Sequence, residues 1–178
     1  MILRHPCMGK LILGTLFFVS SATVLLSADG MTQYENSELG VAVYYPTDWA
    51  MEEEQGISVV FSSDADFKDA EKDTGAGFGL MVLPSEFTEN PELGAIWEAV
   101  MKDIDMQTDE PQSINMSGAT GLYGTINEEE KDMAGVIYIF KAGSKVYMLL
   151  TIIHPASELE DMYKPVLMDM IETLEFMP

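Results

Sequence analysis

Apolar residues are densest in the last third of the chain, where two short runs stand on either side of a turn. The runs cover residues 136–140 and 146–153, and both are rich in β-branched and aromatic side chains. Residues 141–145 separate them and include a glycine and a serine, so the pattern predicts a β-hairpin. Because the second run is apolar at nearly every position, we expect a central strand that is covered on both faces.

An amphipathic pattern follows the hairpin. Its apolar residues have apolar partners three and four positions further along, which places them on one face of a helix. They are Leu159, Met162, Tyr163, Val166, Leu167, Met170, Ile171 and Leu174. Ser157 and Glu160 have the spacing of a capping box, so the helix is expected to begin at Ser157. Pro165 is expected either to kink this helix or to mark a fresh start.

Short strand patterns and turn signals alternate through the stretch before the hairpin. Strands are predicted over residues 32–36, 41–45, 50–53, 57–61, 77–83, 114–116 and 120–126. Asn90 and Pro91 predict the start of a helix, because asparagine caps helices and proline suits the first helical position. The apolar face of that helix comprises Leu93, Ile96, Trp97, Val100, Met101 and Ile104. The pattern predicts one sheet with helices packed on it, in a single domain over residues 31–178.

The first 28 residues have a different composition. Arg4 and Lys10, with no acidic residue between them, precede an apolar stretch that begins at Leu11, and small residues follow. These are the parts of a secretory signal peptide, so we expect residues 1–28 to direct export to the periplasm or the outside of the cell. Residues 11–28 are also just long enough to span a bilayer, and an uncleaved membrane anchor is the alternative.

Acidic residues dominate the chain, with 30 Asp and Glu against 9 Lys and Arg and a net charge of −21 at pH 7. No arginine follows Arg4, and guanidinium is the group that grips phosphate bidentately. A strongly anionic domain without it would repel nucleic acid, which excludes nucleic-acid binding. The charge is typical of solubility outside the cytoplasm, and it also suits an acidic face for cations or for a basic partner.

Few residues suit catalysis. The single cysteine, Cys7, lies in the leader, so the domain can form no internal disulfide and has no thiol nucleophile. His154 is the only histidine beyond the leader, and a catalytic histidine needs a nucleophile and an orienting acid. Ser157 and Glu158 are close along the chain, but Ser157 is already explained as a helix cap. We expect His154 to be structural; an extracytoplasmic hydrolase that uses His154 and carboxylates is the alternative.

Asp103, Asp105 and Asp109 are weak candidates for metal ligands. They lie at the carboxyl end of the first predicted helix, where negative charge is unfavourable. Functional sites are places where such local rules break, and clustered carboxylates can bind cations. A cation or small-ligand carrier is therefore a further alternative, although no cofactor is expected.

The order of elements resembles a known family. Residues 34–49 contain a strand, a small turn, an aromatic-rich strand that ends at Pro46, and Trp49 three residues later. Towards the C terminus come the apolar hairpin, a His154-Pro155 step, and a helix closing on residues 171–176. This series is similar to PsbP-like domains over about residues 32–177, with the middle matching in element order rather than in residues.

The PsbP-like family includes an extrinsic subunit of the photosynthetic oxygen-evolving complex, DcrB-related bacterial envelope proteins and a Ran-binding nuclear transport factor. The resemblance implies an α+β fold, an α/β/α sandwich around a central antiparallel sheet. It also implies docking rather than turnover. We therefore expect an exported, non-enzymatic accessory domain that docks on a protein partner at or near a membrane.

Overall fold

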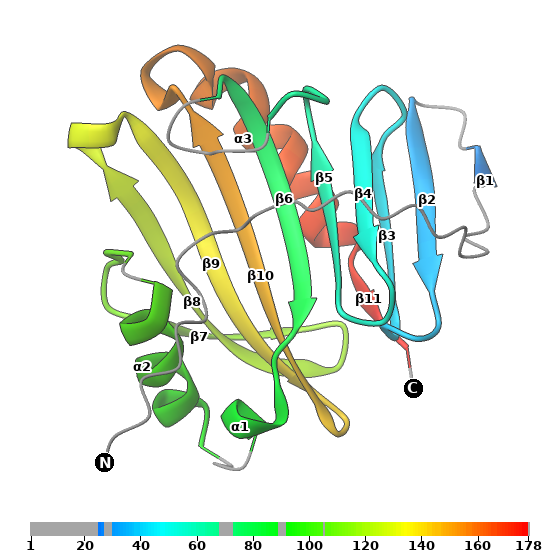
Figure 1. Ribbon diagram of the computed structural model, residues 1–178, viewed down its shortest axis with the longest axis vertical. Helices are drawn as coiled ribbons and strands as arrows, with labels where there is room; N and C mark the ends of the chain where they lie inside the picture. The colour runs from blue at the N-terminus through cyan, green and yellow to red at the C-terminus, as the bar shows by residue number, and fades with distance from the viewer. Residues whose placement is uncertain (1–24, 27–29, 68–72, 89–91, 105, 178) are drawn as a thin grey trace, which may run out of the picture.

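A seven-stranded antiparallel sheet forms the centre of the protein (Figure 1). The computed structural model describes residues 25–26, 30–67, 73–88, 92–104 and 106–177. The strands of this sheet are β4 (Ala50–Glu54), β5 (Ser58–Ser62), β6 (Gly75–Val82), β7 (Gln112–Met116), β8 (Ala119–Glu128), β9 (Met133–Ala142) and β10 (Lys145–His154). They lie in the order β4-β5-β6-β10-β9-β8-β7. The predicted α+β class with an antiparallel sheet is confirmed.

The predicted hairpin is confirmed as β9 and β10. Lys145 pairs with Ala142, so the turn is shorter than the sequence suggested and consists of Gly143 and Ser144. β10 is the middle strand of the seven, between β6 and β9. It is the central strand that its nearly unbroken apolar run predicts.

A second, four-stranded sheet lies beside the first and was not part of the predicted architecture. Its strands are β1 (Leu25–Leu26), β2 (Met31–Asn36), β3 (Val41–Pro46) and β11 (Glu175–Phe176), in the order β1-β2-β3-β11. The chain returns at its C-terminal end to place Phe176 opposite Val41. The expected α/β/α layering therefore omitted a sheet that shares one face of the molecule with the last helix.

The two faces of the large sheet carry separate hydrophobic cores. Along β9, Ile137 and Ile139 belong to one core, while Tyr138 and Phe140 belong to the other. This alternation follows from the two-residue period of a strand. The first core lies under α2 (Leu93–Ile104), and the second lies between the sheet, the small sheet and α3 (Ala156–Thr173). In Figure 1, α2 lies in front of the sheet and α3 behind it.

The first predicted helix is confirmed as α2. Ile96, Trp97 and Val100 are buried at helical spacing, as its apolar pattern predicts. Asn90 and Pro91, the expected start, lie outside the described residues, and a one-turn helix, α1 (Ser85–Thr88), precedes them unpredicted.

The predicted capping box of the last helix is wrong. α3 begins at Ala156 with Pro155 at the cap position, and Ser157 lies inside the first turn. The cap comes from Asp132, whose Oδ1 accepts a hydrogen bond from the Ser157 backbone N–H at 2.8 Å. The backbone carbonyl of Asp132 accepts from the Ala156 N–H at 2.6 Å. A residue between β8 and β9 thus satisfies amides that the helix itself leaves without partners.

α3 continues without a break past Pro165, so of the two expectations for this residue a fresh start is wrong. Leu167, Met170 and Ile171 are buried on the predicted face. Met162, expected on that face, is instead 62% exposed.

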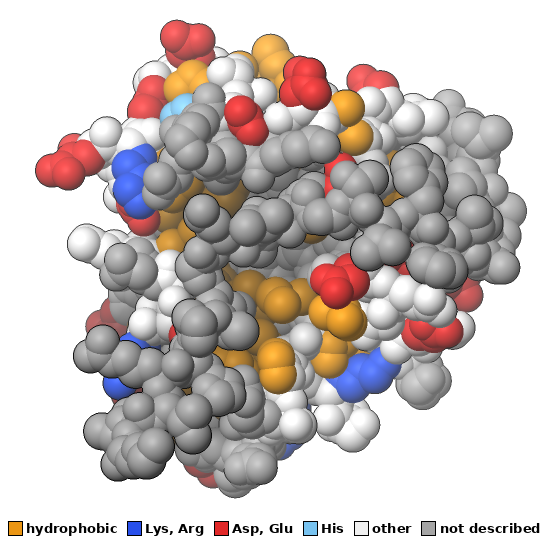
Figure 2. Space-filling model, viewed as in Figure 1, with side chains coloured by type: hydrophobic (Ala, Val, Ile, Leu, Met, Phe, Trp, Pro, Cys, Tyr) orange, Lys and Arg blue, Asp and Glu red, His pale blue; other side chains and the backbone are white. Residues whose placement is uncertain are grey.

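Leu25 and Leu26, at the end of the expected leader, pair with β2 as β1. Residues 1–24 and 27–28 of that leader lie outside the described residues. Among the described helices, none is long and apolar enough to cross a membrane. On the face shown in Figure 2, acidic side chains are more numerous than basic ones among the described residues.

Candidate functional site

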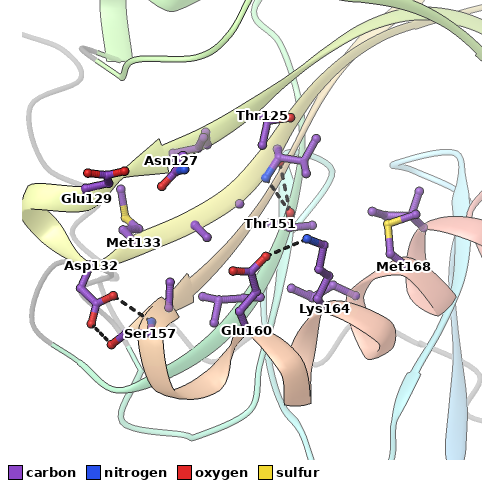
Figure 3. A pocket seen from close by; sticks show the side chains of 18 residues that line it. Thr125, Asn127, Glu129, Asp132, Met133, Thr151, Ser157, Glu160, Lys164 and Met168 are labelled. Carbon is purple, nitrogen blue, oxygen red and sulfur yellow. Dashed lines mark hydrogen bonds and ion pairs between the residues drawn. The ribbon is translucent and has the colours of Figure 1, made fainter.

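A groove runs between α3 and the ends of β8, β9 and β10, with a volume of about 570 Å³ (Figure 3). We call it the α3 groove. Its lining residues are Thr125, Ile126, Asn127, Glu129, Asp132, Met133, Ala134, Gly135, Val136, Thr151, Ile153, Ala156, Ser157, Glu160, Lys164, Leu167, Met168 and Ile171. Binding sites in proteins are commonly concave regions of this size.

The strand wall of the groove follows from the alternation of side chains along β8. Thr125 and Asn127 are two residues apart, so both lie on the α3 face of the sheet, and both are exposed. Gly124, between Tyr123 and Thr125 on the strand, faces α2 instead. The end of β8 therefore lines the groove with a hydroxyl and an amide, which can pair with a peptide backbone.

The helix wall of the groove follows from the period of α3. Glu160, Lys164 and Met168 are spaced four residues apart and so lie on one face. Lys164 Nζ lies 2.7 Å from Glu160 Oε1, and this exposed ion pair sits midway along the wall. Met168, further along the helix, is 42% exposed. The wall changes from charged to apolar along the helix.

The floor of the groove is closely packed backbone. The Thr151 hydroxyl accepts a hydrogen bond from the Val136 N–H at 3.0 Å and donates to the Val136 carbonyl at 3.2 Å. Beside it, any side chain at Gly135 would collide with the Thr151 carbonyl oxygen. Glycine is therefore required at this point for β9 and β10 to approach each other.

An acidic rim closes the end of the groove near the start of α3. Glu129 belongs to the short 3-10 helix η1 (Glu129–Lys131), and Asp132 follows in a left-handed conformation with φ of 50°. The Ser157 hydroxyl donates to Asp132 Oδ2 at 2.5 Å. The hydroxyl and backbone N–H of Ser157 hold the pKa of the Asp132 carboxyl below its usual range. Asp132 is thereby kept anionic at the rim.

His154 does not line this groove. Ile153 lines it, and the next residue of the strand points to the opposite face of the sheet. The Nδ1 atom of His154 lies 3.0 Å from the carbonyl oxygen of Asp73. Ser157, which the hydrolase alternative would need beside a histidine, is bonded to Asp132 instead. The two candidate residues are thus directed to different partners.

The three candidate metal ligands are placed differently from one another. Asp103 is exposed in the last turn of α2, and Asp105 lies outside the described residues. Asp109 Oδ1 accepts a hydrogen bond from the Thr125 N–H at 2.7 Å, so it fixes the loop after α2 to β8. Among the described residues, no group of three or more His, Cys, Asp or Glu side chains is arranged to hold a metal ion.

Most of the groove was missed by sequence reasoning. The sequence patterns assign no site to residues 127–132, to Lys164 or to Met168. The one signal in the chain is the pair Thr125 and Asn127, polar residues at alternate positions on a strand that is otherwise partly buried. The alternation of polar residues along a strand shows which face they share, but it does not show which element packs against that face.

No protein-family model and no curated protein matches the chain. The solution structure of cyanobacterial PsbP (CyanoP) from Synechocystis sp. PCC 6803 matches with a TM-score of 0.56 and 14% identity, covering 92% of this chain and 98% of that one. The crystal structure of PA94 from Pseudomonas aeruginosa, a protein of unknown function described as a candidate regulator, matches with a TM-score of 0.52 and 15% identity, covering 83% of this chain and 98% of that one.

These two structures and the order of helices and strands define the fold class. The protein is an antiparallel α+β domain in which two helices pack on a large sheet. Its fold is PsbP-like, so the resemblance that residues 32–177 suggested is confirmed at the level of the fold.

Proposed function

We propose that this protein is a non-enzymatic accessory domain that docks on a protein partner, and that the α3 groove is its docking site. The observation that carries the proposal is the make-up of the groove. One end carries the half-exposed Met168, the rim is polar, and no histidine is among the lining residues. Such a surface offers contact area and hydrogen bonds to a partner rather than an activated nucleophile.

The arrangement of possible catalytic groups supports docking over hydrolysis. Hydrolysis without a cofactor requires a nucleophile, a base and donors for the developing negative charge. His154 faces away from the groove, and Ser157 within it donates to a carboxylate. An oxyanion would also meet Glu129, Asp132 and Glu160, which repel negative charge.

The similar folds of CyanoP and PA94 are compatible with an accessory or regulatory role. At 14% and 15% identity, these two structures support the fold but do not identify a partner for this chain. Export, and a position at or near a membrane, are proposed with the docking role because the first 28 residues have the composition of a signal peptide or anchor.

Two methionines of α3 provide a matched test. Met168 lines the groove and is 42% exposed, whereas Met162 lies outside it and is 62% exposed. We expect Met168→Glu to lower the partner recovered with the full chain from native membranes by about tenfold, because it puts a charge on an apolar contact. Met162→Glu should change recovery by less than about twofold, since isolated surface residues contribute little to binding.

Circular dichroism would establish that both variants are folded. Equal recovery with the two variants would show that the partner does not use this groove. Turnover of esters, peptides or glycosides by the purified protein, lost in a folded His154→Ala variant, would replace docking by hydrolysis.

A further inference from the structure

The α3 groove is elongated. Its lining on the helix side extends from Ser157 to Ile171, which is about 21 Å at 1.5 Å per helical residue. An extended peptide advances about 3.3 Å per residue, so about six residues would fill this length. The shape fits a stretched segment of chain better than a compact small molecule.

The two ends of the groove differ in chemistry. The end near the start of α3 carries the carboxylates of Glu129 and Asp132, and Glu160 follows along the helix towards the middle of the groove. The other end carries the apolar side chain of Met168, which is 42% exposed, together with the buried Leu167 and Ile171. A segment that matches both ends is positively charged at one terminus and apolar towards the other.

The carboxylates outnumber the positive charge available to them within the groove. Lys164 is the only basic residue among the lining residues, and it is paired with Glu160. Ser157 holds Asp132 through hydrogen bonds but brings no charge. The groove therefore keeps an excess of negative charge, in a chain whose net charge is −21. Such a potential attracts cationic segments and repels anionic ones.

The strand wall can bind the backbone of such a segment. Thr125 and Asn127 stand at alternate positions of β8, exposed on the groove side. Their spacing of two residues matches the repeat of an extended chain, whose amide and carbonyl groups recur with the same period. The groove thus offers polar contacts along its side, apolar contacts at one end and carboxylates at the other.

We propose that the α3 groove binds an extended segment of about six residues from a partner protein, with a lysine or arginine against Glu129 and an apolar side chain against Met168. This inference rests on the proposed docking function and specifies the chemistry of the partner. It excludes acidic segments and partners that present a folded, uncharged surface.

Random octapeptides displayed on phage test the proposal without knowledge of the partner. The library is selected on the purified full chain and counter-selected on folded Met168→Glu. We expect the recovered peptides to carry lysine or arginine at one end and aliphatic residues after it. Recovery of acidic peptides, of peptides without net positive charge, or of none that distinguish the two proteins would overturn the inference.

Neighbouring glutamates give the matched control. Glu129 lines the groove and Glu130 does not, although both are exposed in η1. For a recovered peptide labelled with fluorescein, we expect anisotropy to show a Kd about fivefold or more weaker with Glu129→Lys, since charge reversal at a rim opposes a cation. Glu130→Lys should change Kd by less than about twofold, because it leaves the lining intact.

Equal weakening by the two reversals would overturn the inference, because the peptide would then sense only net charge. The docking function is tested separately by the recovery of the native partner. If recovery of the native partner depends on Met168 while the selected peptides lack basic residues, the docking function is supported and the proposed basic segment is wrong. If recovery does not depend on Met168, the docking site itself is wrong.

Discussion

The two faces of the large sheet are covered in different ways. On one face, α2 lies close to β8, where a Cβ atom at Gly124 would be 3.0 Å from ring atoms of Trp97. On the other face, α3 packs on β10 and on β3 of the small sheet, and the Thr173 hydroxyl accepts a hydrogen bond from the Tyr44 N–H at 3.1 Å. Because α3 packs on both sheets, it lies away from β8 and leaves the α3 groove open.

This difference separates the face that contributes most to stability from the face that carries the proposed docking groove. The face under α2 is sealed by a large aromatic residue and a glycine that makes room for it. The α3 face is sealed only where the two sheets meet, and β8 remains accessible through Thr125 and Asn127. Substitutions should therefore lower the free energy of unfolding strongly at α2 and at the buried side of α3, and only weakly at the exposed residues of the groove.

The largest effect is expected from Trp97→Ala. Trp97 is 5% exposed, and its removal should lower the free energy of unfolding by about 3–5 kcal/mol. Met168→Ala, on the groove wall, should cost roughly 0.5 kcal/mol or less. Urea denaturation measures both. Similar losses would show that the two faces are sealed alike.

Leu167→Ala should come next. Leu167 is 3% exposed and faces the core between the two sheets, so emptying its site should cost about 2–5 kcal/mol. Glu172→Ala, on the exposed side of the same helix, should cost roughly 0.5 kcal/mol or less. Thermal unfolding followed by circular dichroism separates the two, and equal shifts would mean that the buried face of α3 is misassigned.

Adjacent positions of β8 compare the two faces directly. Gly124→Val should lower the free energy of unfolding by about 1–3 kcal/mol, because the new side chain meets Trp97. Thr125→Val points into the open groove and should change it by about 0.5 kcal/mol or less. A tolerated valine at residue 124 would contradict the close approach of α2.

The smallest effect concerns the start of α3 and its dependence on pH. Hydrogen bonds from Ser157 lower the pKa of Asp132 from its ordinary value of 3.8. The stability that the ionised Asp132 carboxylate adds to the folded protein is therefore complete well above pH 3.8. It is lost as the pH falls through the lowered pKa of Asp132. The difference in Tm between wild type and Asp132→Asn should be constant from pH 7 to pH 5 and shrink towards pH 3. A difference that grows on acidification would refute this assignment.

The sequence predicted the elements whose signals are local. The hairpin of β9 and β10, the buried face of α2 and the buried part of α3 all follow from periods of 2 or 3.6 residues. Pairing between distant segments has no such signal: nothing in residues 175–176 shows that they join β3. The helix cap was misassigned for the same reason, because Asp132 is 25 residues from Ser157 along the chain.

The groove could not be predicted because it depends on where α3 lies rather than on what α3 contains. Met162 and Met168 illustrate this, since both are exposed although only Met168 lines the groove. The apolar pattern of the helix predicts that Met162 is buried, because Met162 lies on the broad apolar face of the helix. Only part of that face is buried in the structure. The acidic charge was evident from the sequence, but its concentration at one end of a groove was not.

Photo-crosslinking from β8 tests the central claim most directly. A benzoylphenylalanine residue replaces either Asn127, which lines the groove, or Thr120, which is exposed on the opposite face of the same strand. In the native organism's membranes, we expect a discrete protein adduct from residue 127 that disappears with Met168→Glu, and none from residue 120. Adducts of equal yield from both positions, or from residue 120 alone, would contradict docking through the α3 groove.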